Sequence, residues 1–201
     1  EIIRGALNRL GKSRPIFHSE ADFQLALAME IERTESNAEV RLEVPWSSLS
    51  GSHRKKCPKV LPDAKEAEKS FLDLLVFFGE DVVAVELKYN KATICLTEDR
   101  ELFCLGSHIK SYGKYDFCKD IKRLKSFTNI VSGGARVALA VMLTNHKCYW
   151  SSVDRPEWDP PDLRKWGTGI KKTDTEVSNS REESLELPEY EAKWQPYSKF
   201  D

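Results

Sequence analysis

The chain has 201 residues, of which 40% are hydrophobic and 31% are charged, and its formal net charge is −1. These values are ordinary for a soluble globular protein that is large enough to bury a core. The balanced charge excludes a globally basic nucleic-acid-binding protein, so any such surface has to be a local patch. We expect a single domain over residues 1–201, with its core at about 15–150 and a polar, loop-rich extension at about 151–201.

Membrane and secretion signals are missing from the sequence. The longest run without a polar residue, residues 137–143, is far shorter than the roughly 20 apolar residues of a membrane span. Residues 1–15 lack the apolar centre and cleavage site of a signal peptide. The five cysteines are odd in number and form no CxxC pair, which disfavours a disulfide framework and a zinc site. We therefore expect a cytoplasmic protein with no membrane partner, whose cysteines serve as small apolar side chains.

The first predicted helix covers residues 17–35. Apolar residues recur there at helical spacing from Phe23 to Ile31, and Ser19 is a suitable N-cap. Glu20 lies three residues before Phe23, so we expect it on the same buried face, at its N-terminal edge.

Strands are expected next. Residues 38–46 alternate apolar and charged side chains, as in a half-buried strand. Residues 47–69 indicate a loop with a basic cluster, which either contacts phosphate or is a solvated run of charges. Residues 71–78 and 82–89 predict two apolar strands joined by a tight turn. Residues 92–106 predict a further hairpin that turns near its centre.

The second predicted helix covers residues 115–131, and residues 135–145 form an apolar strand that we expect to be buried on both faces. The order of helix, strands, helix and strand indicates an α/β fold, with a mixed sheet flanked by helices.

Ionisable residues stand inside the two most apolar strands. Glu86 and Lys88 are two residues apart, so they share one face of their strand with Val82 and Ala84. Asp73 lies in the preceding strand, and antiparallel pairing across the short turn can bring its carboxylate to that of Glu86. Two carboxylates and a backbone carbonyl make a site suited to Mg²⁺ or Mn²⁺.

Asp73, a spacer formed by residues 74–85, and the tripeptide Glu86-Leu87-Lys88 resemble the signature of the PD-(D/E)xK nuclease superfamily. The proline that often begins this signature is missing before Asp73. The chain also looks like a group of small, uncharacterised prokaryotic proteins assigned to that superfamily, through the segments FHSEADFQ, VRLEVP, LDLLV, AVELKY, YDFCKDIKRL and VMLTN. The resemblance implies a restriction-endonuclease-like core.

The resemblance also implies a chemistry. Asp73, Glu86 and the backbone carbonyl of Leu87 would hold Mg²⁺ or Mn²⁺. Lys88 would orient the attacking water, and Glu20 would hold a second metal ion or a water ligand. The implied protein is a magnesium-dependent phosphodiesterase, an endonuclease that acts on nucleic acid, with DNA as the expected substrate. A restriction-type member that cuts both strands would be a homodimer.

The same residues are compatible with a protein that catalyses no reaction. Glu86 and Lys88 would also suit an edge strand whose polar face meets water and discourages aggregation. The same fold could serve as a non-catalytic module that binds nucleic acid or protein, or as a structural protein. The tripeptide pattern is weak by itself, because Glu191-Ala192-Lys193 carries it too.

The second predicted helix has a local excess of positive charge. Residues 110–127 contain six Lys or Arg and two Asp. A nucleic-acid backbone could contact this face, with Lys119 and Arg123 as the expected contacts. A solvated helix face with ion pairs at i,i+3 and i,i+4, in which Asp120 and Arg123 take part, accounts for the charges equally well.

Overall fold

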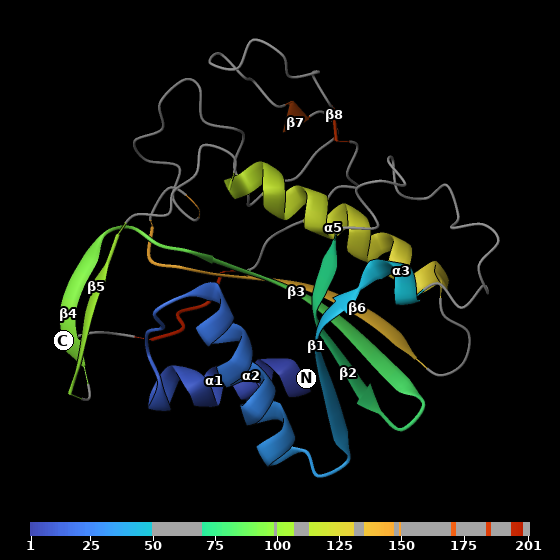
Figure 1. Cartoon of the computed structure of the whole chain (residues 1–201), viewed down its shortest axis with the longest axis horizontal. Coiled ribbons are helices and arrows are strands. Elements are labelled where there is room, and N and C mark those ends of the chain that lie inside the picture. The colour runs from blue at the N-terminus through green and yellow to red at the C-terminus, as the bar shows by residue number, and fades with distance from the viewer. Residues whose placement is uncertain are drawn as a thin grey trace. The chain divides into compact units, whose positions relative to one another are not determined.

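The computed structural model of the chain describes residues 1–49, 70–98, 100–106, 113–130, 135–146, 149, 170–171, 184–185 and 194–198 (Figure 1). The chain divides into two compact units, which are described separately. Unit 1 comprises residues 1–88, 120–141 and 197–201, and unit 2 comprises residues 89–119 and 142–196. The basic cluster expected in the loop after residue 47, and most of the expected C-terminal extension, lie outside the described residues.

Unit 1 begins with two helices, α1 (Ile2–Ser13) and α2 (Glu20–Thr34). The prediction of α2 is confirmed together with its cap, because the Ser19 side chain accepts a hydrogen bond from the Asp22 backbone amide at 3.1 Å. Capping satisfies an amide that has no partner within the helix. α1 is not among the predicted elements, although its buried residues follow a helical spacing: Ile3, Ala6 and Leu10.

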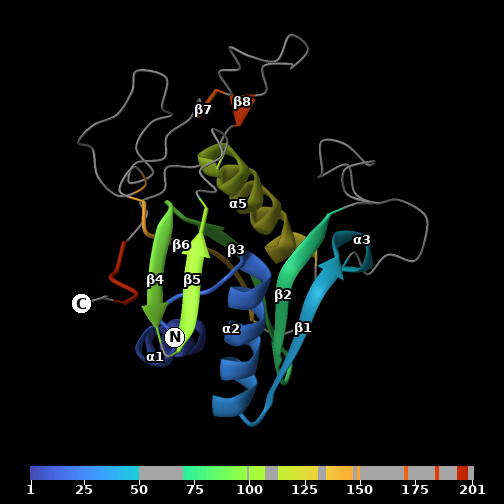
Figure 2. The ribbon, with the colours of Figure 1, turned by 60° about the vertical axis from the view of Figure 1, so that its left-hand side comes forward.

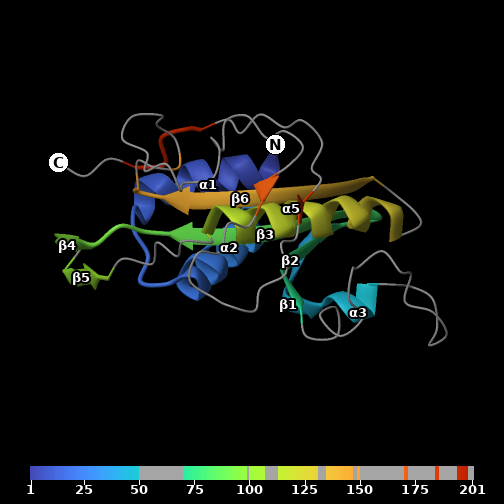
Figure 3. The ribbon, with the colours of Figure 1, turned by 90° about the horizontal axis from the view of Figure 1, so that it is seen from above.

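A four-stranded sheet forms the centre of the fold, in the order β1 (Ala38–Pro45), β2 (Phe71–Phe78), β3 (Asp81–Asn90) and β6 (Arg136–Thr144). β2 pairs antiparallel with both β1 and β3. The arrows of β3 and β6 point the same way in Figure 3, so the sheet is mixed. The predicted strands 38–46, 71–78 and 82–89 are therefore confirmed.

Helices cover both faces of this sheet in unit 1, as predicted. Figure 1 shows α5 (Gly113–Ile130) on one face and α1 with α2 on the other. Leu124 and Phe127 of α5 pack against the sheet, in a cluster closed by the short helix α3 (Trp46–Leu49). The sheet residues of that cluster are Leu72, Leu75, Val82 and Ala84.

The expected burial of the last strand is wrong. Every side chain of β6 is half-buried or exposed, and Val137 is 43% exposed. β6 lies at the end of the strand order, so no further strand covers its outer side within the described part of the sheet. An apolar run alone does not distinguish a central strand from an outer one.

Unit 2 contains the predicted hairpin, formed by β4 (Ile94–Glu98) and β5 (Glu101–Leu105), which run side by side in Figure 2. Cys95 and Cys104 are direct cross-strand partners, both are exposed, and they are joined by a disulfide. Their expected role as apolar filler is therefore wrong, whereas Cys118 is buried, as expected for a small apolar side chain.

Two further short strands in unit 2, β7 (Ile170–Lys171) and β8 (Ser184–Leu185), pair with each other. Within the described part of the chain, no helix is long and apolar enough to cross a membrane.

The end of the chain packs on α1 and the segment that follows it. The Tyr197 hydroxyl donates to the Arg14 carbonyl at 3.0 Å, and the Ser198 hydroxyl donates to the Pro15 carbonyl at 3.0 Å. A Cβ atom added at Gly11 would overlap the backbone carbonyl of Tyr197. The absence of a side chain at Gly11 therefore permits this contact.

This contact predicts opposite effects of one substitution at two glycines of α1. Gly5→Ala should raise the free energy of unfolding by about 0.5–1 kcal/mol, because alanine is the better helix former. A Cβ there would meet only the flexible Arg9 side chain, at 3.2 Å. Gly11→Ala should lower the free energy of unfolding, because it displaces Tyr197. Urea denaturation of both variants measures the difference, and equal stabilisation by both would contradict the contact.

Candidate functional site

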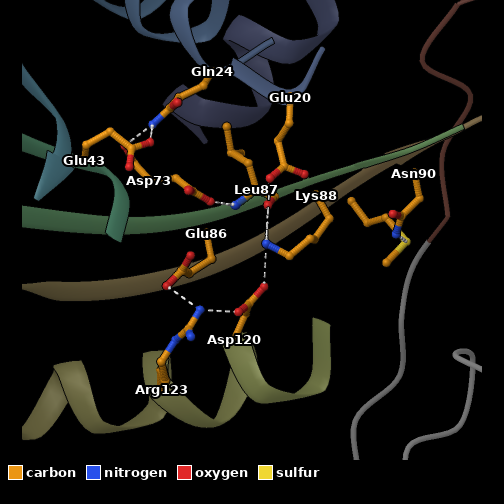
Figure 4. A network of polar contacts seen from close by, with 11 residues as sticks. Glu20, Gln24, Glu43, Asp73, Glu86, Leu87, Lys88, Asn90, Asp120 and Arg123 are labelled. Atoms are coloured by element: carbon orange, nitrogen blue, oxygen red, sulfur yellow. Dashed lines mark hydrogen bonds and ion pairs between the residues drawn. The ribbon is translucent and has the colours of Figure 1, made fainter. Parts of the chain in front are cut away.

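The register of the sheet aligns the two acids of the predicted metal site. The antiparallel pairing of β2 with β3 extends to Leu74 and Val85, and the next step of that register sets Asp73 opposite Glu86. Beyond that point the Asp73 carboxylate replaces a backbone acceptor, because its Oδ2 accepts a hydrogen bond from the Leu87 amide at 2.5 Å (Figure 4). The hydrogen bonding between β2 and β3 therefore ends with the Leu87 amide bound to the side chain of Asp73 and not to a backbone carbonyl.

Glu86 is buried on the face of the sheet that α5 covers. Its side chain is 2% exposed, and it shares that face with Val82 and Ala84 of the core cluster. β3 lies between β2 and β6 in the sheet. The interpretation of Glu86 and Lys88 as the polar face of an edge strand is therefore wrong.

Lys88 connects three elements of unit 1. Its Nζ lies 3.0 Å from the Leu87 carbonyl oxygen, 2.9 Å from Asp120 Oδ2 on α5, and 3.9 Å from Glu20 Oε1 on α2. The Lys88 side chain is 21% exposed and that of Glu20 is 44% exposed, so Glu20 is the acid of this group that water reaches most easily. The structure therefore brings Glu20 to the site, where the sequence pattern placed it.

Arg123 contributes a second positive charge. Its Nη2 lies 3.3 Å from Glu86 Oε1 and also contacts the Asp120 carboxylate (Figure 4). Its Nε is buried and has no hydrogen-bond partner among the described residues. Arg123 thus points into the carboxylate cluster. Lys119, the other expected nucleic-acid contact, is half-buried and belongs to unit 2.

Asp120 is a site residue that the sequence pattern does not identify. The pattern is compatible with Asp120 in ion pairs on a solvated helix face, but Asp120 is 3% exposed. Asp120 stands three residues after Phe117 and four before Leu124, both of which are buried. An acid at a stripe position of a helix is the signal that could have identified it.

Gln24 of α2 links the backbone of Asp73 to the side chain of Glu43 in β1 by hydrogen bonds. The Gln24 amide donates to the Asp73 carbonyl at 2.6 Å and to Glu43 Oε1 at 2.9 Å. Glu43 has a φ of 51°, the left-handed region that non-glycine residues seldom adopt. Its position in β1 is opposite Asp73, since the neighbouring pairs on either side are in register. Neither residue is predicted for the site from the sequence.

Negative charge exceeds positive charge in this cluster. Four carboxylates face two cationic side chains: Glu20, Asp73, Glu86 and Asp120, with Lys88 and Arg123. Burial, together with the nearby Asp120 carboxylate, raises the pKa of Glu86 to about 8. Burial also raises the pKa of Asp73 above its usual value.

The pKa of Lys88 moves in the direction that keeps it charged. Burial acts to lower it, but the carboxylates of Asp120 and Glu20 outweigh burial, and the pKa of Lys88 is raised. Lys88 is therefore an ammonium at neutral pH, able to donate hydrogen bonds but not to accept a proton.

The expected metal ligands match a hard cation in kind. The carboxylates of Asp73 and Glu86 and the carbonyl of Leu87 are oxygen donors, and burial raises the pKa of both acids. Among the described residues, no three His, Cys, Asp or Glu side chains gather as closely as a metal site requires. For these oxygens to coordinate an ion, the contacts of Arg123 with Glu86 and of Lys88 with the Leu87 carbonyl would have to break.

The raised pKa of Glu86 predicts how stability depends on pH. The folded protein retains a proton at Glu86 up to a pH of about 8, whereas the unfolded chain releases it near the ordinary value of 4.5. Protonation therefore favours the folded state, and this contribution is lost as pH rises from about 4.5 to 8.

Glu86→Gln is neutral throughout that range, so its free energy of unfolding should fall less than that of the wild type between about pH 5 and pH 8. The expected difference is on the order of a few kcal/mol, because one pKa unit corresponds to about 1.4 kcal/mol. Urea denaturation across this range measures it, with Glu80→Gln in the exposed turn before β3 as the control. Parallel pH profiles for the wild type and Glu86→Gln would contradict the assignment.

Comparison of the chain with protein-family models, curated proteins and solved structures finds no match. The resemblance to PD-(D/E)xK nucleases therefore rests on the sequence motif.

Proposed function

We propose that the protein is a divalent-metal-dependent nuclease of the PD-(D/E)xK type, which hydrolyses phosphodiester bonds in nucleic acid, with DNA as the expected substrate. One observation supports this proposal most strongly. The strand register sets Asp73 opposite Glu86, while Lys88, on the face of Glu86, lies near Glu20 from a separate element. The four residues to which the resemblance assigns one chemistry are thus neighbours in space, at a site with excess negative charge.

Asp73, Glu86 and the Leu87 carbonyl are the ligands proposed for Mg²⁺ or Mn²⁺. Such an ion, when bound, polarises a phosphate and lowers the pKa of a coordinated water. Gln24 fixes the backbone of Asp73 by its hydrogen bond to the carbonyl, which limits the movement of that carboxylate. Asp73 and Glu86 belong to paired strands, so their spacing is set by the sheet and not by a loop.

Lys88 and Glu20 act on the water and the phosphate. The Lys88 ammonium donates a hydrogen bond that orients the attacking water, and it offsets the charge that develops at phosphorus. Its raised pKa makes it a poor proton acceptor, so it serves as a donor and not as a general base. Glu20, half-exposed at the start of α2, accepts a hydrogen bond from the water on the solvent side.

A non-catalytic binding module on the same fold is the second candidate. The contacts of Arg123 with Glu86 and of Lys88 with Asp120 favour it, because they neutralise carboxylates without a metal ion. A module of this kind would bind nucleic acid or protein but would not hydrolyse it. Metal binding and cleavage separate the two candidates.

Cleavage of a panel of plasmid, single-stranded DNA, branched DNA and RNA with Mg²⁺ or Mn²⁺ tests the proposal. Wild type should cleave at least one substrate, and Lys88→Ala should lower the rate by about 100-fold or more, as expected when a positioned donor is lost. Lys193→Ala, in the second Glu-x-Lys tripeptide of the sequence, is the matched control and should keep the wild-type rate.

The outcomes discriminate clearly. Equal loss in both lysine variants would indicate a general charge effect and contradict the assigned role of Lys88. Wild type that neither cleaves any substrate nor binds Mn²⁺ by calorimetry would refute the nuclease proposal. Mn²⁺ binding without cleavage by the wild type would favour the binding module.

A further inference from the structure

We propose that Arg123 is an internal counterion that competes with the divalent cation for Glu86 and then binds the substrate phosphate. The inference rests on the proposed metal-dependent function and adds a role to it. In this role Arg123 of α5 pairs with Glu86 in the substrate-free protein and binds phosphate when the substrate is present. It is therefore not a contact on a solvated helix face.

The contacts of Glu86 support the first part. A carboxylate that is 2% exposed requires a partner if it is to carry charge, and Arg123 Nη2 lies 3.3 Å from its Oε1. Lys88, on the same strand face, is directed to Asp120 and to the Leu87 carbonyl. Among the described residues, Arg123 is therefore the cation in direct contact with Glu86.

Competition follows from this placement. A divalent cation that coordinates Glu86 puts a second positive charge beside the Arg123 guanidinium, which then has to move away from that oxygen. Because one carboxylate cannot satisfy both cations fully, free energy gained by the Arg123 pair is subtracted from the free energy of cation binding. Arg123 thus weakens the cation affinity of the substrate-free protein.

The remaining contacts show where Arg123 can act after a cation has displaced it from Glu86. Its Nη2 also pairs with Asp120, three residues earlier on α5, so this tether holds the guanidinium near the site. Asp120 simultaneously pairs with Lys88 at 2.9 Å, so one carboxylate contacts both cations. Asp120 is therefore a positioning residue for both.

The guanidinium retains unused donors. Its Nε is buried without a hydrogen-bond partner among the described residues, which is unusual for a buried N–H group. A guanidinium presents five N–H donors in a planar fork that matches two oxygens of one phosphate. A phosphate held next to Glu86 would supply the acceptors that the protein does not.

The test measures two affinities of Arg123→Gln that should change in opposite directions. With Mn²⁺ alone, calorimetry should show that Arg123→Gln binds the ion about tenfold more tightly than wild type, because the ion no longer has to break the Arg123–Glu86 pair. Lys125→Gln is the matched control, because Lys125 is an exposed cation on the same helix and its loss changes the net charge equally. It should leave Mn²⁺ affinity within about twofold of wild type.

The second affinity is that for nucleic acid, measured by fluorescence anisotropy with duplex and single-stranded DNA oligonucleotides in Ca²⁺. Arg123→Gln should bind whichever form wild type prefers about tenfold more weakly, as expected for the loss of a phosphate contact. Arg123→Lys keeps the charge, so both affinities should return towards the wild-type values.

Tighter Mn²⁺ binding together with weaker DNA binding supports the inference, because a merely structural role for Arg123 would weaken both. Unchanged or weaker Mn²⁺ binding in Arg123→Gln, with a wild type that binds Mn²⁺, overturns it and leaves the proposed function standing. Wild type that does not bind Mn²⁺ refutes the proposed function itself, and this inference with it.

Discussion

The buried carboxylate of Glu86 is the constraint on which the rest of the site depends. A carboxyl group with 2% exposure keeps its proton well above its usual pKa, and it carries a charge only if cationic partners approach it closely. β2 contributes another acid, Asp73, and no positive charge. The positive charge in contact with Glu86 is Arg123 of α5, so this helix has to dock with Arg123 above β3, while Leu124 and Phe127 of the same helix fill the core. One electrostatic requirement thus accounts for how the helix is placed on the sheet.

Much of the fold was predictable because it follows from local patterns. Helical spacing and the Ser19 cap identified α2, and the short turn between β2 and β3 was enough to expect Asp73 opposite Glu86. The burial of β6 was not predictable, because it depends on the order of strands in the sheet. Asp120 was missed for a related reason: Asp120 and Ile121 point about 100° apart on a helix, and only the docking of α5 decides which one is buried.

The cysteines show that a general rule based on their number and spacing can fail where local strand pairing decides. An odd number of cysteines without a CxxC pair disfavoured a disulfide framework, and the predicted hairpin carried no expectation of a cross-strand cysteine pair. The register of β4 with β5 pairs Cys95 with Cys104, and both are exposed. Directly opposite residues of a hairpin have Cβ atoms close enough for such a bond. The observed register of the hairpin was here decisive, and among the described cysteines the buried Cys118 follows the general expectation.

A cation site built from buried acids has to fold before its cation arrives. The cluster meets this condition in two ways, since the Glu86 pKa of about 8 lets a proton remain at neutral pH, and Arg123 with Lys88 supplies positive charge. Both devices stabilise the cluster, and both would oppose binding of the proposed cation. A mobile arginine has an advantage over a proton in this role. Once displaced from Glu86 it keeps its charge, and Asp120 holds that charge where a bound phosphate would need it.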